Sequence, residues 1–100
     1  MDDTVYLALN YPYTYTRMIQ FLDQTVEECP EDVIIEKNIL NHTISNNAIP
    51  YLKIRHQENY SKNTIFLLGR QHPGETVGSF VLEGFVKELL KNNKPLLKKY

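Results

Sequence analysis

The spacing of apolar and polar side chains predicts an amphipathic helix in the first third of the chain. Between Thr14 and Cys29, apolar residues recur every three or four positions, and charged residues occupy the opposite face. This pattern is typical of a helix that packs one stripe on a sheet. Thr14 or Thr16 is the expected N-cap, and Pro30 follows just beyond the expected end.

A second helix is predicted from Glu75 to about Lys91. Its apolar residues are distributed around much of its circumference, at Val77, Phe80, Val81, Leu82, Phe85, Val86, Leu89 and Leu90. Such a helix needs cover on more than one side. Gly78 and Gly84 lower its intrinsic stability, which suits a backbone that packs closely on a neighbour.

Four short runs have the character of strands. Thr4–Leu9 and Thr64–Leu68 are apolar and partly β-branched, and we expect the second to be buried. Val33–Leu40 and Ala48–His56 are joined by a polar turn, and their order predicts an antiparallel hairpin. Pro50 cannot donate a backbone hydrogen bond, so it predicts an edge or a bulge in the second strand of this hairpin.

The order strand, helix, strand, strand, strand, helix predicts an α/β protein. A chain of 100 residues forms one domain at most, and its core is modest. Residues Lys91–Tyr100 are interpreted as an exposed basic end or a loop toward a next element. Cys29 is predicted to be a small core residue. Tyr11, Tyr13 and Tyr15 are predicted to pack against the body rather than to form a binding platform.

Composition narrows the class of partner. The chain is 42% hydrophobic and 23% charged with a formal net charge of −1, which argues against nucleic acid as the main partner. The sequence has no apolar run of the roughly 18 residues that a membrane span requires. The acidic start predicts no secretory signal, and a single cysteine suits a reducing, cytoplasmic setting.

Residues Gly69–Thr76 carry the candidate chemistry. His72 and Glu75 form a His-x-x-Glu pair between a predicted strand and a predicted helix. Pro73 restricts one backbone torsion and Gly74 permits many, so together they turn the chain between the two side chains. An imidazole and a carboxylate at this spacing can share one zinc ion, and catalytic zinc sites commonly have three protein ligands. The exposed N–H groups at a helix start also favour an ionised carboxylate there.

The pair by itself is not specific, because a chain with three histidines contains one by chance about one time in four. Its setting is more informative, since α/β proteins place ligands at the carboxyl ends of strands. His42 and His56 are weaker ligand candidates because neither has a carboxylate three residues later, and we expect both to be solvated. No residue is singled out as a catalytic acid or base.

Two segments resemble one known family. The run from Gly69 to Thr76 contains His-Pro-Gly-Glu-Thr, the centre of the zinc motif of the M14 metallocarboxypeptidases of the cytosolic carboxypeptidase subfamily. Upstream, Tyr11–Tyr15 resembles the Tyr-Pro-Tyr-Thr-Tyr segment that opens the catalytic domain of this subfamily. The chain departs from the subfamily at Val77–Ser79, where Asn-Ser-Ser is usual, and this departure affects no ligand.

The resemblance implies an incomplete three-layer α/β/α fold with a mixed sheet, in which residues 1–100 are the N-terminal portion of a catalytic domain. It implies zinc as cofactor, with His72 and Glu75 as two of its three ligands. In the family the third ligand is a downstream histidine, and the catalytic glutamate and the Asn-Arg pair for the substrate carboxylate are also downstream. None of these can be located here, so the isolated chain is expected to be inactive.

The activity that the resemblance implies is the removal of C-terminal residues from proteins or peptides. Glutamates of polyglutamylated tubulin are the implied substrate. Two alternatives stay open: a non-catalytic truncated remnant or binding module, and a related zinc deacylase that shares the fold and the His-x-x-Glu pair. The Pro-Gly-Glu-Thr context and the Tyr-Pro-Tyr-Thr-Tyr segment count against the deacylase.

Overall fold

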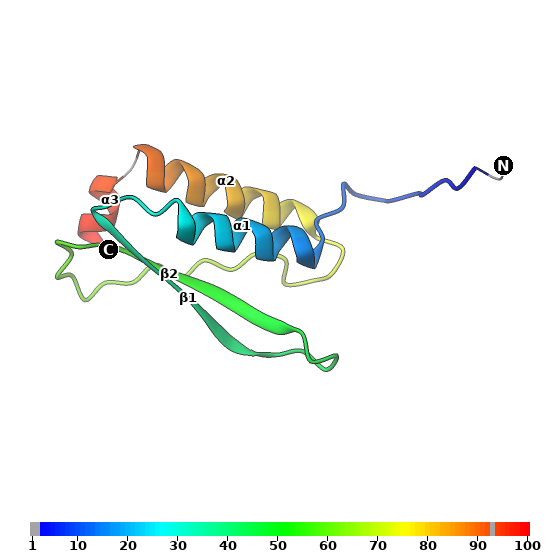
Figure 1. Cartoon of the computed structure of the whole chain (residues 1–100), viewed down its shortest axis with the longest axis horizontal. Helices are drawn as coiled ribbons and strands as arrows, with labels where there is room; N and C mark the ends of the chain where they lie inside the picture. Colours follow the sequence, from blue (N-terminus) through cyan, green and yellow to red (C-terminus); the bar gives the residue numbers. More distant parts are fainter. Residues whose placement is uncertain (1–2, 93) are drawn as a thin grey trace.

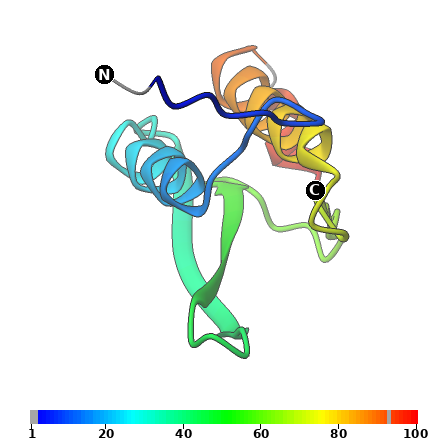
Figure 2. The ribbon, with the colours of Figure 1, turned by 90° about the vertical axis from the view of Figure 1, so that its right-hand side faces the viewer.

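The computed structural model describes residues 3–92 and 94–100, and it contains helices and a two-stranded antiparallel sheet. Two long helices lie on one side of a hairpin, and the N-terminal segment projects away from the body (Figure 1). Figure 2 shows the two helices side by side, with the hairpin extending away from them. The elements are α1 (Tyr15–Glu27), β1 (Val33–His42), β2 (Ala48–His56), α2 (Thr76–Asn92) and α3 (Lys94–Lys99).

Helix α1 forms as predicted. Thr14 is its N-cap, and the Thr14 hydroxyl accepts a hydrogen bond from the Arg17 backbone N–H at 3.1 Å. This bond satisfies one of the donors that the first turn of a helix leaves unpaired. The helix ends at Glu27, shortly before Pro30, and buries Leu22 and Thr25.

The predicted hairpin is confirmed, and β1 and β2 pair along their whole length. Their register shifts between Ile39, which faces Pro50, and Asn41, which faces Ile49. Leu40 is therefore the extra residue of a bulge. The bulge lies beside Pro50, where the missing N–H interrupts the ladder, as the sequence predicted.

The other two predicted strands are wrong. Neither Thr4–Leu9 nor Thr64–Leu68 forms a strand, and their apolar side chains are exposed, with Leu7 at 95% and Phe66 at 81%. A strand needs a neighbour to pair its backbone groups and an opposite layer to cover its side chains. Within the described residues β1 and β2 pair with each other only, so these segments remain without regular structure.

The C-terminal prediction is correct for its exposed lysines, Lys98 and Lys99, and wrong for the loop. Apart from Asn93, which lies outside the described residues, the region from Lys91 to Tyr100 is helical almost to its end rather than a loop. Leu97 of α3 is buried in the main core cluster with Val33 and Leu89. The pair of leucines among the lysines gives the short helix one apolar side, and the described lysines beyond it remain exposed.

The core is small for the length of the chain. Cys29 packs against the cluster of Val33, Leu89 and Leu97, which confirms its predicted place. The accessible surface is 8128 Å², whereas a compact protein of 11.7 kDa exposes roughly 5,900 Å². The radius of gyration is 16.2 Å, against about 13 Å for a compact domain of this size. Much apolar surface is left uncovered.

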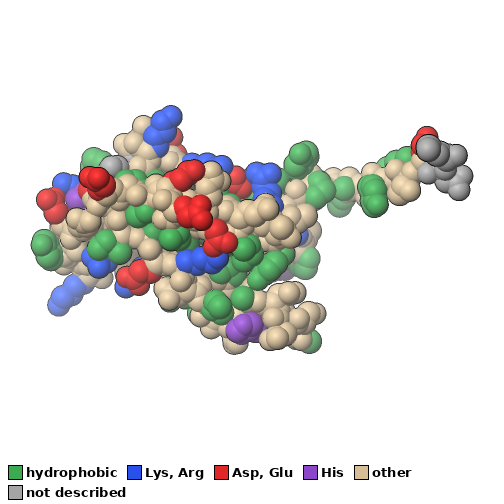
Figure 3. All heavy atoms as spheres, viewed as in Figure 1, with side chains coloured by type: hydrophobic (Ala, Val, Ile, Leu, Met, Phe, Trp, Pro, Cys, Tyr) green, Lys and Arg blue, Asp and Glu red, His purple; other side chains and the backbone are tan. Residues whose placement is uncertain are grey.

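Part of that surface is a stripe along α2 formed by Val77, Val81 and Phe85, which recur at four-residue intervals and are all exposed. The sequence predicted that this helix needs cover on more than one side, and the described residues leave this side open. Figure 3 shows further apolar side chains along the projecting N-terminal segment.

Candidate metal centre

The candidate loop lies between residues 64–68, which have no regular secondary structure, and the start of α2. The absence of side chains at two glycines allows its backbone to lie close to that helix. A Cβ at Gly69 would be 2.6 Å from a methyl group of Leu82 and 3.0 Å from the carbonyl oxygen of Gly78, and one at Gly78 would be 3.1 Å from the Arg70 nitrogen. The predicted close packing at Gly78 is thus confirmed, whereas Gly84 has no neighbour within 4 Å of such an atom.

The loop turns at Pro73 and Gly74, as predicted, and the Glu75 backbone N–H donates to the His72 carbonyl oxygen at 3.1 Å. The left-handed backbone conformation is at Arg70, with φ of 57°, and not at the glycine. A non-glycine residue in this region carries strain that its surroundings must offset.

The turn brings the two predicted ligands together. His72 Nδ1 and Glu75 Oε1 are 2.9 Å apart, and their side chains are 70% and 61% exposed. The sequence predicted Glu75 in the first turn of α2, but Glu75 immediately precedes the helix. Its carboxylate nevertheless lies near the free N–H groups of the helix start. The pair can bond to each other or present one nitrogen and one oxygen to a shared ion.

This donor set fits part of a zinc site. Two ligand atoms at ordinary zinc distances and a tetrahedral angle are about 3.3 Å apart, close to the observed separation. Within the described residues, no group of three or more His, Cys, Asp or Glu side chains is placed to hold a metal ion. His72 and Glu75 can therefore supply two ligands, and a closed site requires a third from elsewhere.

The other two histidines differ from each other. His42 is exposed, as expected, but the prediction that His56 is solvated is wrong, because it is only 3% exposed. His56 Nδ1 accepts the Glu58 backbone N–H at 3.0 Å, and its Nε2 lies 3.4 Å from Asp32 Oδ2. The hairpin register explains this burial, because Val33 faces His56 and so brings the preceding residue, Asp32, to the same end of the sheet.

The loop is tied to the Tyr-Pro-Tyr segment by three side chains that the sequence did not single out. Asn10 Nδ2 donates to the Gly74 carbonyl oxygen at 2.9 Å, and the Thr76 hydroxyl donates to that of Tyr11 at 2.9 Å. The Arg70 guanidinium donates to the carbonyl oxygens of Tyr13 and of the loop residue Pro73. Their position within or beside the two motifs was the available signal.

Behind the loop, Tyr13 is buried edge-on against Phe80, with ring centroids 4.9 Å apart. This confirms its predicted packing role. The Tyr11 ring also contacts Phe80, with centroids 5.8 Å apart, but it remains largely exposed. The Arg17 guanidinium lies over both the Tyr13 and the Phe80 rings. Burial, followed by the nearby charge of Glu83, raises the pKa of Tyr13 above its ordinary value.

Glu83 of α2 is a buried carboxylate, at 8% exposure, and the sequence pattern did not predict this burial. Lys87 Nζ donates to it at 2.7 Å, and the Arg17 guanidinium contacts both of its oxygens at 3.3 to 3.4 Å. Burial pushes the pKa of Glu83 upward, but the bonds from Lys87 and Arg17 outweigh it and hold the pKa below its ordinary value. The cluster links α1 to α2.

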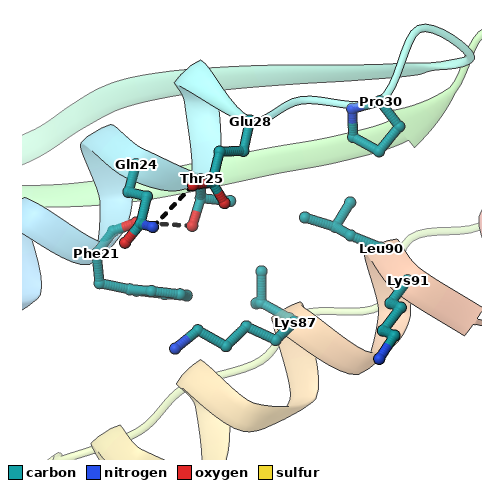
Figure 4. A pocket seen from close by; sticks show the side chains of 9 residues that line it. Phe21, Gln24, Thr25, Glu28, Pro30, Lys87, Leu90 and Lys91 are labelled. Carbon is teal, nitrogen blue, oxygen red and sulfur yellow. Dashed lines mark hydrogen bonds between the residues drawn. The ribbon is translucent and has the colours of Figure 1, made fainter.

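A groove of about 260 Å³ continues between α1 and α2 beyond this cluster (Figure 4). Phe21 and Thr25 line it from α1, and Lys87 and Leu90 line it from α2. Neither candidate ligand contributes to its lining, so it is separate from the candidate metal centre.

Comparison with known proteins decides the family, because residues 18–100 match the zinc carboxypeptidase family, peptidase M14. The chain belongs to this family. The combination of helices with an antiparallel sheet is consistent with a partial zinc carboxypeptidase fold, and the predicted α/β class is confirmed. No solved structure matches the chain significantly.

The relatives of this zinc carboxypeptidase chain are named cytosolic carboxypeptidases, which confirms the predicted subfamily resemblance. The chain is 35% identical to cytosolic carboxypeptidase 1 of Homo sapiens, in an alignment that covers 92% of the chain and 8% of the relative. It is 33% identical to cytosolic carboxypeptidase 3 of Bos taurus, over 91% and 10%, and 34% identical to cytosolic carboxypeptidase 6 of Mus musculus, over 92% and 17%. The chain thus spans less than a fifth of each of these relatives.

No helix in the described part of the chain is both long and apolar enough to cross a membrane.

Proposed function

We propose that this chain is the N-terminal portion of a metallocarboxypeptidase catalytic domain and that it supplies two zinc ligands, His72 and Glu75. The observation that carries the proposal is the 2.9 Å approach of these side chains in a solvent-open loop, in a chain of the zinc carboxypeptidase family. The large uncovered apolar surface supports the view that these residues form part of a larger domain.

In this proposal the chain binds and orients the ion without performing proton transfer. A zinc ion held by these residues would supply Lewis-acid chemistry, through polarisation of the scissile carbonyl and activation of a water molecule. The His72 imidazole would hold the ion through a nitrogen and the Glu75 carboxylate through an oxygen. Hydrolysis needs a third ligand and a general base, and among the described residues no third ligand side chain is placed beside this pair. The chain alone is therefore proposed to be inactive.

The proposed reaction is the release of C-terminal residues from proteins or peptides in the cytoplasm. Its support is that the relatives are named cytosolic carboxypeptidases. We propose glutamates of polyglutamylated tubulin as the substrate, on the basis of the subfamily resemblance at His72–Thr76 and Tyr11–Tyr15.

Calorimetric titration of the purified chain with Zn²⁺ tests the site. We expect weak binding of one ion, loss of that binding in His72→Ala, and retention in His42→Ala, which removes an exposed histidine from the end of the hairpin. Circular dichroism should be the same for all three proteins, because both imidazoles lie outside the core. Wild-type zinc affinity in His72→Ala would refute the assignment.

Activity is tested separately with a peptide that ends in a run of glutamates. The chain alone should release no glutamate in the presence of Zn²⁺, as measured by mass spectrometry. Release that is abolished by His72→Ala would show that the missing catalytic groups are present in these residues, against the proposal.

A further inference from the structure

Three long-range hydrogen bonds join the candidate loop to one short segment near the N-terminus. Asn10 reaches Gly74, Thr76 reaches the carbonyl of Tyr11, and Arg70 reaches the carbonyl of Tyr13. These bonds connect positions separated by 57 to 65 residues in the sequence. They are therefore tertiary contacts between distant segments and not bonds within a local turn.

The bonds bracket both candidate ligands. Arg70 lies two residues before His72 and also bonds to Pro73, directly after it. The Asn10 bond is made to Gly74, directly before Glu75, and Thr76 directly follows Glu75. If the loop backbone moved relative to the Asn10–Tyr13 segment, bonds on both sides of the ligand pair would break.

The loop needs such support because its ligand side chains are exposed and receive little from packing. The Asn10–Tyr13 segment can provide it, because Tyr13 is buried against Phe80 of α2 and lies beneath the Arg17 guanidinium. Segment and loop are thus both held to the N-terminal half of α2, the segment through Tyr13 and the loop through the close approach of Gly69 and Gly78.

We infer that Asn10, Arg70 and Thr76 are positioning residues that use the Asn10–Tyr13 segment to hold His72 and Glu75 at the separation a metal ion requires. The inference rests on the proposed zinc site. On this reading the two motifs of the chain are one functional unit: the upstream segment holds the geometry and the loop supplies the ligands. Groups that bond directly to metal ligands commonly change metal affinity by 10- to 100-fold, and these three side chains act one step further away, through the loop backbone, so the lower end of that range is expected.

Thr76→Val is the sharpest test, because valine has nearly the same shape and lacks the hydroxyl. Thr25→Val is a matched control: each threonine is 7% exposed and donates to a carbonyl oxygen, but the Thr25 bond is made to Phe21 within α1. Calorimetry with Zn²⁺ should show about tenfold weaker binding for Thr76→Val, near-normal binding for Thr76→Ser, and no change for Thr25→Val.

A second measurement needs no zinc. Hydrogen exchange at the Glu75 amide, which donates to the His72 carbonyl, should accelerate in Thr76→Val and stay unchanged in Thr76→Ser and Thr25→Val. Asn10→Ala should act in the same direction for both zinc affinity and exchange, and Asn10 is exposed, so the fold is not at risk.

Unchanged zinc affinity and unchanged Glu75 exchange in both Thr76→Val and Asn10→Ala would overturn the positioning role. A wild-type chain that binds no Zn²⁺ refutes the proposed zinc site instead. In that case the exchange measurements alone decide whether the segment holds the loop.

Discussion

Replacing Glu83 by glutamine should destabilise the chain more than its single lost charge suggests. The carboxylate is buried and accepts from Lys87 at 2.7 Å and from Arg17 at 3.3 to 3.4 Å. In Glu83→Gln the two cations face each other across α1 and α2 with no anion between them. The substitution therefore removes an attraction and creates a repulsion.

The magnitude follows from the exposure of the partners. A hydrogen bond to a charged group contributes about 1.5 to 3 kcal/mol. The Arg17 side chain is 44% exposed and the Lys87 side chain 62% exposed, however, so water replaces part of what they lose. We expect a net loss of about 2 kcal/mol in the free energy of unfolding. With a urea dependence of about 1 to 2 kcal/mol per molar, the unfolding midpoint should fall by roughly 1 to 2 M.

Urea unfolding followed by circular dichroism measures this loss. Glu88→Gln is the matched control, because Glu88 is an exposed glutamate of the same helix whose bond is made to Asn92. It should change the free energy of unfolding by less than about 0.5 kcal/mol. Equal midpoints for the two variants would show that the buried cluster does not hold α1 to α2.

Three further outcomes are expected. The pKa of Glu83 is lowered in the folded chain, so this carboxylate stabilises the fold above its ordinary pKa of 4.5, and that stability should be lost as the pH falls below this value. The urea midpoint should therefore fall between pH 6 and pH 3. A constant midpoint, or an equal fall in Glu83→Gln, would contradict this. Leu97→Ala should cost about 2 to 3 kcal/mol in urea unfolding, because it empties part of the core, and Leu96→Ala, at a more exposed position, should cost clearly less; similar costs would mean that α3 is not docked. Gly69→Ala should lower the thermal midpoint of unfolding, because the added methyl group collides with Leu82 and the Gly78 carbonyl. Gly84→Ala should raise it, because alanine has the higher helix propensity and its methyl group meets open space. The reverse order would refute the close packing of the loop on α2.

Local signals in the sequence were sufficient for α1, its Thr14 cap, the hairpin and the bulge beside Pro50. Each depends on residues near one another in the chain, so spacing and capping chemistry predict them. The His72–Glu75 approach is of the same kind, since a three-residue turn determines it. The candidate site was therefore predictable as a pair.

Features that depend on distant partners were not predictable. Thr4–Leu9 and Thr64–Leu68 have strand composition, but a strand forms only where another strand accepts its hydrogen bonds, and composition cannot supply the neighbour. The burial of Glu83 and of His56 likewise depends on Arg17 and Asp32, which the fold brings near. The ties from Asn10 and Thr76 join segments more than sixty residues apart, and no periodicity reports such a contact.

The imidazole nitrogen resonances of the three histidines during a Zn²⁺ titration test the central claim most directly. The account predicts that the Nδ1 resonance of His72, the nitrogen 2.9 Å from Glu75 Oε1, shifts with added zinc, while those of His42 and His56 stay in place. In Glu75→Gln the same shift should require a higher zinc concentration. A titration in which His72 is unmoved, or in which His42 or His56 responds in its place, would contradict the assignment of this loop as the metal centre.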